Sequence, residues 1–316
     1  MANFLNHQIM IATDKLSLGL LFPIEAFEGP VPRMDKHAQI ALAQQAEALG
    51  FHTLWVRDVP LFDPNFRDVG QIYDPWVYMA HIATLTHKIK LGTASMVLPL
   101  RHPIHFAKSA ASIDQLFPGR LHLGVASGDR AIEYPAFNKP YENRSIDFMR
   151  QIETIRTFWS EDFPHYETSF GKMQGEADVI PKPVNKRIPM YITGHAGGIN
   201  LDWIAQNGDG WIYYPREFAY TKNIIQNWKT TLKKYNQPDK PYIQPLYIDL
   251  LEDPNAEPIT IELGFRLGRN YLIDLLQTLK FMGVSHTIFI AKFCSRPMNE
   301  VLDEIGKEVL PYMNEG

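Results

Sequence analysis

Hydrophobic positions along the chain follow two different periods in alternation. Short runs rich in β-branched and aromatic residues predict strands, and the segments between them carry apolar residues three and four positions apart, as in helices buried on one face. Within residues 34–49, Ala38, Leu42 and Leu49 share such a face. Asp74 followed by Pro75 is typical of a helix N-cap and its first position. The chain therefore alternates strand and helix from residue 16 to its end.

The alternation predicts eight strands and eight helices in strict order. A helical crossover between two strands makes them pair in parallel, and eight such units close into a barrel, whereas an open doubly wound sheet usually has about five or six strands. We therefore expect an α/β fold, a (β/α)8 TIM barrel. The strands are predicted at residues 16–22, 53–57, 89–97, 121–126, 190–193, 210–214, 242–251 and 287–291, and the longer helices at about 34–49, 74–83, 102–116, 144–160, 198–207 and 264–282.

Two segments lie outside the predicted strands and helices. Residues 1–15 precede the first strand as an N-terminal extension, and residues 161–188 separate the fourth long helical segment from the fifth strand. The second segment is too long for an ordinary connection, so we expect an insertion that lies over a site. No change in composition marks a second domain, and residues 1–316 are expected to form one domain.

Composition narrows the class of protein. Lys and Arg number 31 against 35 Asp and Glu, for a net charge of −4, and a nucleic-acid-binding protein would more often be basic. A single cysteine, Cys294, excludes an internal disulfide and a cysteine-based zinc site in these residues. No apolar run approaches the roughly 18 residues of a membrane span, and the first residues lack the features of a signal peptide. We expect a cytoplasmic protein with neither a nucleic-acid nor a membrane partner.

The carboxyl ends of barrel strands are where active sites lie in this architecture. The G-x-S-x-G motif of serine hydrolases and the G-x-G-x-x-G motif of dinucleotide folds are both absent. His102 and His105 lack a carboxylate at metal-site spacing, so a capping or packing role is favoured over a metal site. Lys292 lies at a strand end, where a lysine can form a Schiff base, so an aldolase is an alternative function.

An anion site is the pattern that remains. Gly197 and Gly198, after His195, lie between a strand and a helix, where backbone N–H groups and the helix N-terminus attract phosphate. Ser127 and Gly128 follow the neighbouring strand, and Arg144 begins the next long helix, where it could pair with a phosphate. An ordinary glycine loop is the alternative. A phosphate site without a metal or nucleophile motif suggests an organic phosphorylated cofactor.

Three stretches of the chain resemble the luciferase-like flavin monooxygenases. They are residues 91–138 (LGTASMVLPL to AIEYPAFN), residues 40–58 and residues 181–212, and the similarity extends over about residues 16–312. The resemblance implies a (β/α)8 barrel that binds FMN, or the deazaflavin F420 in one branch. It places the cofactor phosphate at Ser127, Arg144, Gly197 and Gly198, and a non-proline cis peptide under the ring at Ala94–Ser95. Together with Gly128 and His195 from the anion pattern, these are the candidate cofactor-binding residues.

The resemblance also implies a histidine base after the second strand, and here that region reads Arg57-Asp58-Val59. Asp58 and His195 are therefore the candidate catalytic residues, with a structural role for each as the alternative. We expect the FMN-dependent monooxygenase component of a two-component system, using reduced flavin and O₂ on a small apolar organic substrate. A separate flavin reductase and a homodimer follow from the same expectation. An F420-dependent hydride transferase and a flavin-binding protein without turnover are the alternatives.

Overall fold

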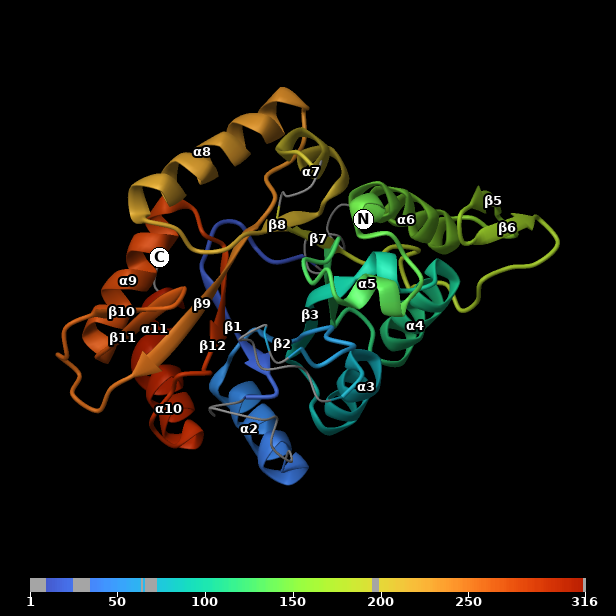
Figure 1. Ribbon diagram of the computed structural model, residues 1–316. Coiled ribbons are helices and arrows are strands. Elements are labelled where there is room, and N and C mark those ends of the chain that lie inside the picture. The colour runs from blue at the N-terminus through green and yellow to red at the C-terminus, as the bar shows by residue number, and fades with distance from the viewer. Residues whose placement is uncertain (1–9, 25–34, 64, 66–72, 195–198, 315–316) are drawn as a thin grey trace.

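Parallel strands closed into a barrel form the centre of the molecule (Figure 1). The computed structural model describes residues 10–24, 35–63, 65, 73–194 and 199–314. Each strand pairs in parallel with the next, and the last pairs with the first, which confirms the predicted TIM barrel. The barrel strands are β1 (Ser17–Phe22), β2 (Thr53–Val56), β3 (Lys90–Val97), β4 (Leu121–Ala126), β7 (Met190–Thr193), β8 (Gly210–Ile212), β9 (Tyr242–Leu250) and β12 (His286–Ile290).

Helices surround the barrel on its outside (Figure 1). As the sequence predicted, the Asp74 side chain caps a helix by accepting hydrogen bonds from the backbone N–H groups of Trp76 and Val77. None of the described helices combines the length and apolar character needed to cross a bilayer. The outer helices are α2 (Lys36–Leu49), α3 (Pro75–Leu85), α4 (Pro103–Leu116), α6 (Arg144–Ser160), α7 (Leu201–Asn207), α8 (Phe218–Lys234), α9 (Arg269–Met282), α10 (Met298–Glu304) and α11 (Leu310–Asn314). Short turns complete the chain: η1 (Leu98–Leu100), α5 (Glu133–Ala136), η2 (Tyr141–Asn143) and the π-helical η3 (Ile305–Val309).

Two hairpins add strands that the sequence pattern did not predict. β10 (Ile259–Ile261) and β11 (Gly264–Leu267) pair antiparallel, and β11 continues the sheet beside β9. The predicted helix start at residue 264 is therefore wrong. β5 (His165–Thr168) and β6 (Gly171–Gln174) form the second hairpin within residues 161–188, and it lies at the side of the barrel beyond α4 and α6 (Figure 1).

A single tryptophan fills the middle of the barrel. Trp55 on β2 is fully buried, and its indole N–H donates to Nε2 of His286 on β12 at 2.9 Å. A Cβ added at Gly19 would lie 2.6 Å from the indole nitrogen, and one at Gly92 would lie 2.4 Å from indole Cε3. Both inward-facing positions on the flanking strands β1 and β3 must therefore be glycine.

Three imidazoles form a polar layer on the amino-terminal side of this tryptophan, and those of His122 and His286 are fully buried. Because His286 accepts from Trp55 through Nε2, its neutral ring carries the proton on Nδ1, which lies 2.7 Å from the Ser17 hydroxyl. The ring of His52 lies 5.9 Å from that of His122 and 5.5 Å from that of His286. Burial lowers the pKa of all three, and that of His52 falls to about 4. The layer is therefore uncharged at neutral pH.

Substitution of Gly92 by alanine should test the packing of the indole. The added methyl group overpacks the barrel, and we expect a loss of about 1–3 kcal/mol of unfolding free energy. In the Trp55→Phe background, which removes the ring atoms that the methyl group meets, the same substitution should cost clearly less. Chemical denaturation of the two single variants and the double variant measures the coupling. Strictly additive losses would show that the two residues do not constrain each other.

Acid should destabilise the protein through the imidazole layer. The folded-state pKa of these histidines is depressed, so their contribution is fully present above pH ~6.5 and is lost as the pH falls toward 4. A histidine with the His52 shift loses about 2 kcal/mol of stability between pH 7 and pH 5. His52→Gln should reduce the pH dependence of the unfolding free energy, whereas His87→Gln, at an exposed site, should leave it unchanged. Equal slopes in both variants would contradict the assignment.

Candidate active site

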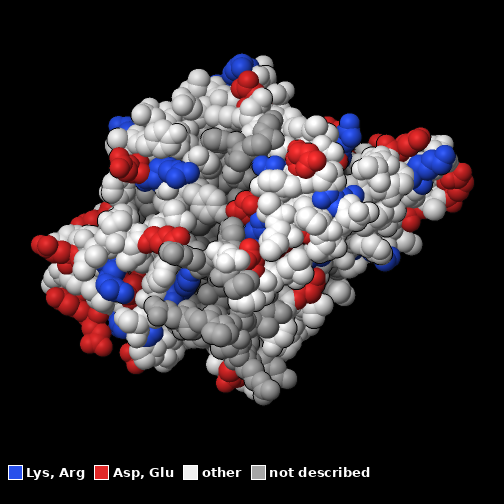
Figure 2. Space-filling view, in the orientation of Figure 1, with Lys and Arg blue, Asp and Glu red and all other residues white. Residues whose placement is uncertain are grey.

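A cavity of about 530 Å³ opens at the carboxyl ends of the barrel strands. Its floor is apolar and includes Leu21, Ile212 and Ile288, which belong to the same cluster as Trp55. Figure 2 shows this face of the molecule, hollowed near its centre, with basic and acidic atoms close together at the hollow. The volume lies in the range of about 300–1,000 Å³ typical of sites for small molecules and cofactors.

The cavity brings together most of the residues predicted for the site. His195, Gly197 and Gly198 lie outside the described residues, so their predicted roles stay predictions. No residue of the 161–188 segment is among the described residues that line the cavity. The predicted residues in its lining are Asp58, Ala94, Ser95, Ser127, Gly128 and Arg144.

One wall is a bulge in β3. The peptide bond between Ala94 and Ser95 is cis, as the resemblance implied, and the pairing of β3 with β4 shifts register between Thr93 and Met96. A Cβ added at Gly124, on the facing strand β4, would lie 2.0 Å from the carbonyl oxygen of Thr93. The bulge therefore depends on glycine at that position. The hydroxyl group of Ser95, within the bulge, makes a short hydrogen bond with the hydroxyl group of Thr193 at the end of β7.

The turn after β4 is held from below by a tyrosine. Gly128 has a φ of 79°, in the left-handed region that favours glycine. A Cβ there would also lie 2.7 Å from Val97 Cγ1 and 2.9 Å from the Tyr134 hydroxyl. That hydroxyl donates a short hydrogen bond to the carbonyl oxygen of Ser127. Ser127 is thereby fixed at the edge of the cavity, with the turn tightly packed beneath it.

Arg144 contributes a positive charge from the first residue of α6. One of its N–H groups donates to the carbonyl oxygen of Tyr141 at 3.1 Å, and its guanidinium carbon lies 3.9 Å from the centre of the Tyr141 ring. No carboxylate of the described chain pairs with it. Arg57, Arg130 and Arg216 also line the cavity. The site therefore has the charge needed to bind an anionic group.

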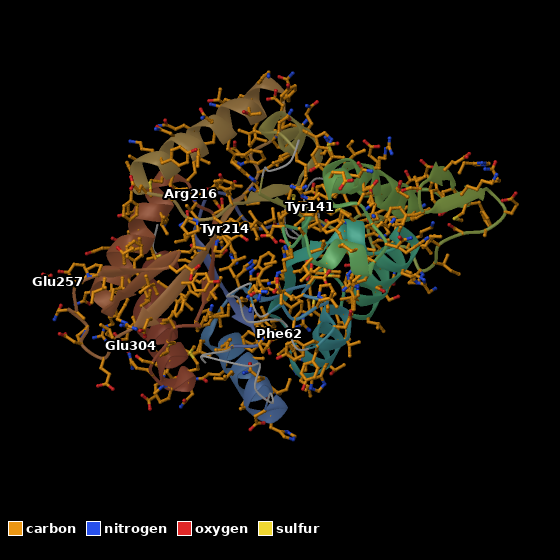
Figure 3. The ribbon with its side chains drawn as sticks, in the orientation of Figure 1. Phe62, Tyr141, Tyr214, Arg216, Glu257 and Glu304 are labelled. Atoms are coloured by element: carbon orange, nitrogen blue, oxygen red, sulfur yellow. The ribbon has the colours of Figure 1, made fainter. Side chains whose placement is uncertain are left out.

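Aromatic side chains stand around the opening. Figure 3 shows Tyr141, Tyr214 and Arg216 around the central opening of the barrel, with Phe62 on another side of it. Tyr141 belongs to η2 and Tyr214 follows β8, so the two rings come from distant parts of the chain. Such rings offer flat apolar surfaces for an organic ligand.

Asp58 is fully engaged within the protein. Its two carboxylate oxygens accept hydrogen bonds from Arg101 at 2.6 and 2.8 Å, and one of them also accepts from the Val97 backbone N–H at 3.1 Å. Arg101 also contacts Asp74 at 3.3 Å. These bonds tie the loop after β2 to the end of β3 and the start of α3. The geometry favours a positioning role for Asp58, and its predicted catalytic role stays a prediction.

A carboxyl group that the sequence analysis did not single out lines the same cavity. Glu133, the first residue of α5, is only 2% exposed, and burial raises its pKa to about 7. The sequence signal that could have found it is an acidic residue six positions beyond the Ser127 turn. Its burial, which makes it unusual, is visible only in the fold.

The other candidate residues have structural contacts. The side chain of His102 caps α4 by accepting from the Ile104 backbone N–H at 3.3 Å, which confirms the predicted capping role. Lys292 is not among the residues that line the cavity, and its ammonium group lies 5.2 Å from the centre of the Phe293 ring. Among the described residues, no group of three or more His, Cys, Asp or Glu side chains could hold a metal ion. These observations leave the anion-binding cavity as the candidate active site.

A barrel with such a cavity at the carboxyl ends of its strands is a typical enzyme architecture. The family model described as luciferase-like monooxygenase matches residues 16–247. The chain therefore belongs to the luciferase-like monooxygenase family, whose members are oxidoreductases that use a flavin or F420. This confirms the resemblance found in the sequence.

The relatives include proteins named as a monooxygenase and as an F420-dependent dehydrogenase. An uncharacterized protein of Mycobacterium tuberculosis is 32% identical over 56% of this chain and 67% of its own. The alkanal monooxygenase alpha chain of Photorhabdus luminescens is 25% identical over 54% of this chain and 45% of its own. An F420-dependent glucose-6-phosphate dehydrogenase of Gordonia bronchialis is 24% identical over 73% of this chain and 69% of its own.

Solved structures show the same fold over almost the whole chain. An F420-dependent secondary alcohol dehydrogenase superposes with a TM-score of 0.77 at 17% identity, covering 95% of this chain and 100% of that one. The oxygenating constituent of 3,6-diketocamphane monooxygenase from Pseudomonas putida, in complex with FMN, superposes with a TM-score of 0.72 at 14% identity, covering 94% and 98%.

Substitution of Arg144 by alanine should weaken FMN binding if this residue holds the phosphate. A charge-assisted hydrogen bond contributes about 1.5–3 kcal/mol, so we expect a loss of about 10- to 150-fold in affinity. Riboflavin, which has no phosphate, should bind both proteins about equally in a fluorescence titration. Arg150→Ala, an exposed arginine on the same helix, is the matched control. An Arg144→Ala protein with unchanged FMN affinity would remove Arg144 from the phosphate site.

Proposed function

We propose that this chain is the FMN-dependent monooxygenase component of a two-component system, acting with reduced flavin and O₂ on a small apolar organic substrate. One observation carries the proposal: Arg144, which pairs with no carboxylate of the described residues, lines a cavity whose floor is apolar. That combination suits a ligand with an anionic end and a flat, uncharged ring. The named relatives with monooxygenase activity support the same reaction class.

The residues present fit a flavin phosphate and ring at separate ends of the cavity. Ser127, Gly128 and Arg144 would hold the phosphate, since they offer a hydroxyl, a backbone N–H group and a guanidinium. Ala94 and Ser95, on the bulged strand β3, would lie against the ring. When bound in reduced form, the flavin supplies the two electrons that allow O₂ to oxidise the substrate.

The contribution of the protein is to position the substrate and to keep water away. Leu21 and Ile288 form an apolar floor, and Trp55 fills the barrel directly beneath them. A dry site prevents loss of the electrons to uncoupled reduction of O₂. Tyr247 and Pro245, at the middle of β9, extend the lining beside this floor. An apolar substrate would be bound there by burial of its hydrocarbon surface.

A second candidate function is hydride transfer with F420. The arginines of the lining favour it, because the acidic tail of that cofactor requires positive charge near the exit of the site. Relatives named as F420-dependent enzymes support it as well. A flavin-binding protein without turnover is the alternative outside the enzymes. Direct titration of the purified protein with FMN and with F420 separates the two cofactors.

Two partners belong to the proposal. The sequence holds no G-x-G-x-x-G motif for a nicotinamide dinucleotide, so a separate flavin reductase would supply the reduced flavin. A homodimer is the expected assembly, and size-exclusion chromatography with light scattering would test it.

If a separate reductase supplies the reduced flavin, the purified chain should show a specific pattern of activity. The purified chain should oxidise NADH poorly with FMN present, and addition of an unrelated flavin reductase should start O₂ consumption. With an apolar substrate, oxidised product should appear at the expense of hydrogen peroxide. The measurement is the ratio of product to peroxide per reduced FMN. Peroxide alone with every substrate of a panel would favour a flavin-binding protein, and rapid NADH oxidation by the chain alone would indicate a reductase.

A further inference from the structure

Glu133 is a buried carboxyl group at the wall of the cavity that the proposed function does not yet use. It follows the turn after β4, where its backbone N–H donates to the carbonyl oxygen of Arg130 at 3.1 Å. This turn directs the side chain inward, and the residue is 2% exposed although it lines the cavity. A carboxyl group is rarely buried to this extent unless it is paired.

One oxygen of this group has no hydrogen-bond partner among the described residues. Oε1 of Glu133 makes no hydrogen bond with the described residues, whereas the side chain does accept from the backbone N–H of Leu61. Buried polar atoms nearly always have a hydrogen-bond partner, and an exception calls for a specific explanation. Because the residue lines the cavity, a ligand bound there could supply the partner that the described residues do not provide.

The groups that act on Glu133 belong to two loops. Asp58 and the Leu61 amide belong to the loop after β2, and Asp129 and Arg130 belong to the loop after β4. Burial is the largest influence and raises the pKa of Glu133 to about 7, with the two aspartates acting in the same direction and Arg130 opposing them. Beyond these, Arg101 neutralises Asp58, and Tyr134, Tyr141 and Arg144 line or border the same end of the cavity.

Asp58 and Glu133 differ in what their oxygens contact. Both oxygens of Asp58 accept hydrogen bonds from Arg101, and one also accepts from the Val97 backbone N–H, so this carboxyl group is engaged within the protein. Glu133 has an oxygen that no group of the described protein holds. The sequence expectation of a proton carrier at the end of β2 is therefore better met by Glu133, which lies beside that loop.

We infer that Glu133 is the proton-carrying residue of the cavity, with Oε1 as the atom that exchanges a proton with the bound cofactor or substrate. The inference rests on the proposed use of this cavity as the cofactor and substrate site. In the acid direction, the O–H bond of the carboxyl group breaks, its electron pair stays on oxygen, and the proton passes to a lone pair of the ligand. The carboxylate that remains lies near Arg130, whose charge stabilises it.

The protonation of Glu133 can be followed without any cofactor. Infrared spectra of the unliganded protein at increasing pH should show a carboxylic C=O band that disappears with a midpoint near pH 7. Glu133→Gln should abolish this band, and Glu142→Gln, at an exposed glutamate of η2, should retain it. A neutral-range titration that survives in Glu133→Gln, or none in the wild-type protein, overturns the inference.

Thermal unfolding gives a second readout without cofactor. The folded-state pKa of Glu133 is raised, so its contribution to stability is present below the unfolded pKa of about 4.5 and is lost as the pH rises toward 7. The Tm of Glu133→Gln minus the Tm of the wild-type protein should therefore increase from pH 5 to pH 8. The variant should be folded at both pH values. Glu142→Gln should show no such gain. A Tm difference that does not change with pH contradicts the inference.

The role in turnover separates proton transfer from simple positioning. With reduced flavin supplied, Glu133→Gln should lower kcat by about 10²- to 10⁴-fold, with a much smaller change in KM and in FMN affinity. Glu133→Asp should recover part of the rate, and its kcat should still change with pH near pH 7. A Glu133→Gln protein with wild-type kcat overturns the inference. If the wild-type protein binds neither FMN nor F420, the proposed function fails, and the cofactor-free titrations still report on Glu133.

Discussion

The packing of Trp55 across the barrel is the constraint on which the site depends. The indole occupies space that side chains at Gly19 and Gly92 would need, and its N–H is anchored on His286. It divides the interior into a polar layer of neutral histidines toward the amino-terminal ends of the strands and an apolar layer toward the carboxyl ends. The cavity can have a dry floor because this single side chain separates it from the buried imidazoles.

The backbone, more than the side chains, shapes the wall above that floor. Gly124 lets the bulged segment around Ser95 come close to β4, and Gly128 lets the following turn pack on Val97 and the Tyr134 hydroxyl. Both contacts bring main-chain atoms to the edge of the cavity. A flat ring can be approached closely only by such atoms and by small residues.

The barrel could be predicted from the sequence because short apolar runs, most of them bounded by turn residues, alternate with segments of helical period. The prediction failed where the period was ambiguous: Leu267 shares helical spacing with Tyr271, yet it lies in β11. Strand-end reasoning placed Asp58 and Ser127 at the cavity, but not what they contact. The pairing of Asp58 with Arg101, 43 positions away in the chain, exists only in the fold, as does the burial of Glu133.

The distribution of charge at the cavity follows from which groups the protein satisfies internally. The Asp58 carboxyl group is fixed in place because Arg101 binds both of its oxygens, and the cost of burying it is thereby offset. Arg144 is stacked on Tyr141 and bonded to a carbonyl group, which orients its charge without neutralising it. Glu133 lines the same cavity with an oxygen that makes no hydrogen bond to the described residues. A fixed cation and an exchangeable proton above a dry floor are what binding an anionic cofactor and moving a proton beside it require. Because each property arises from a contact made inside the protein, the chemistry of the site is set before any ligand enters it.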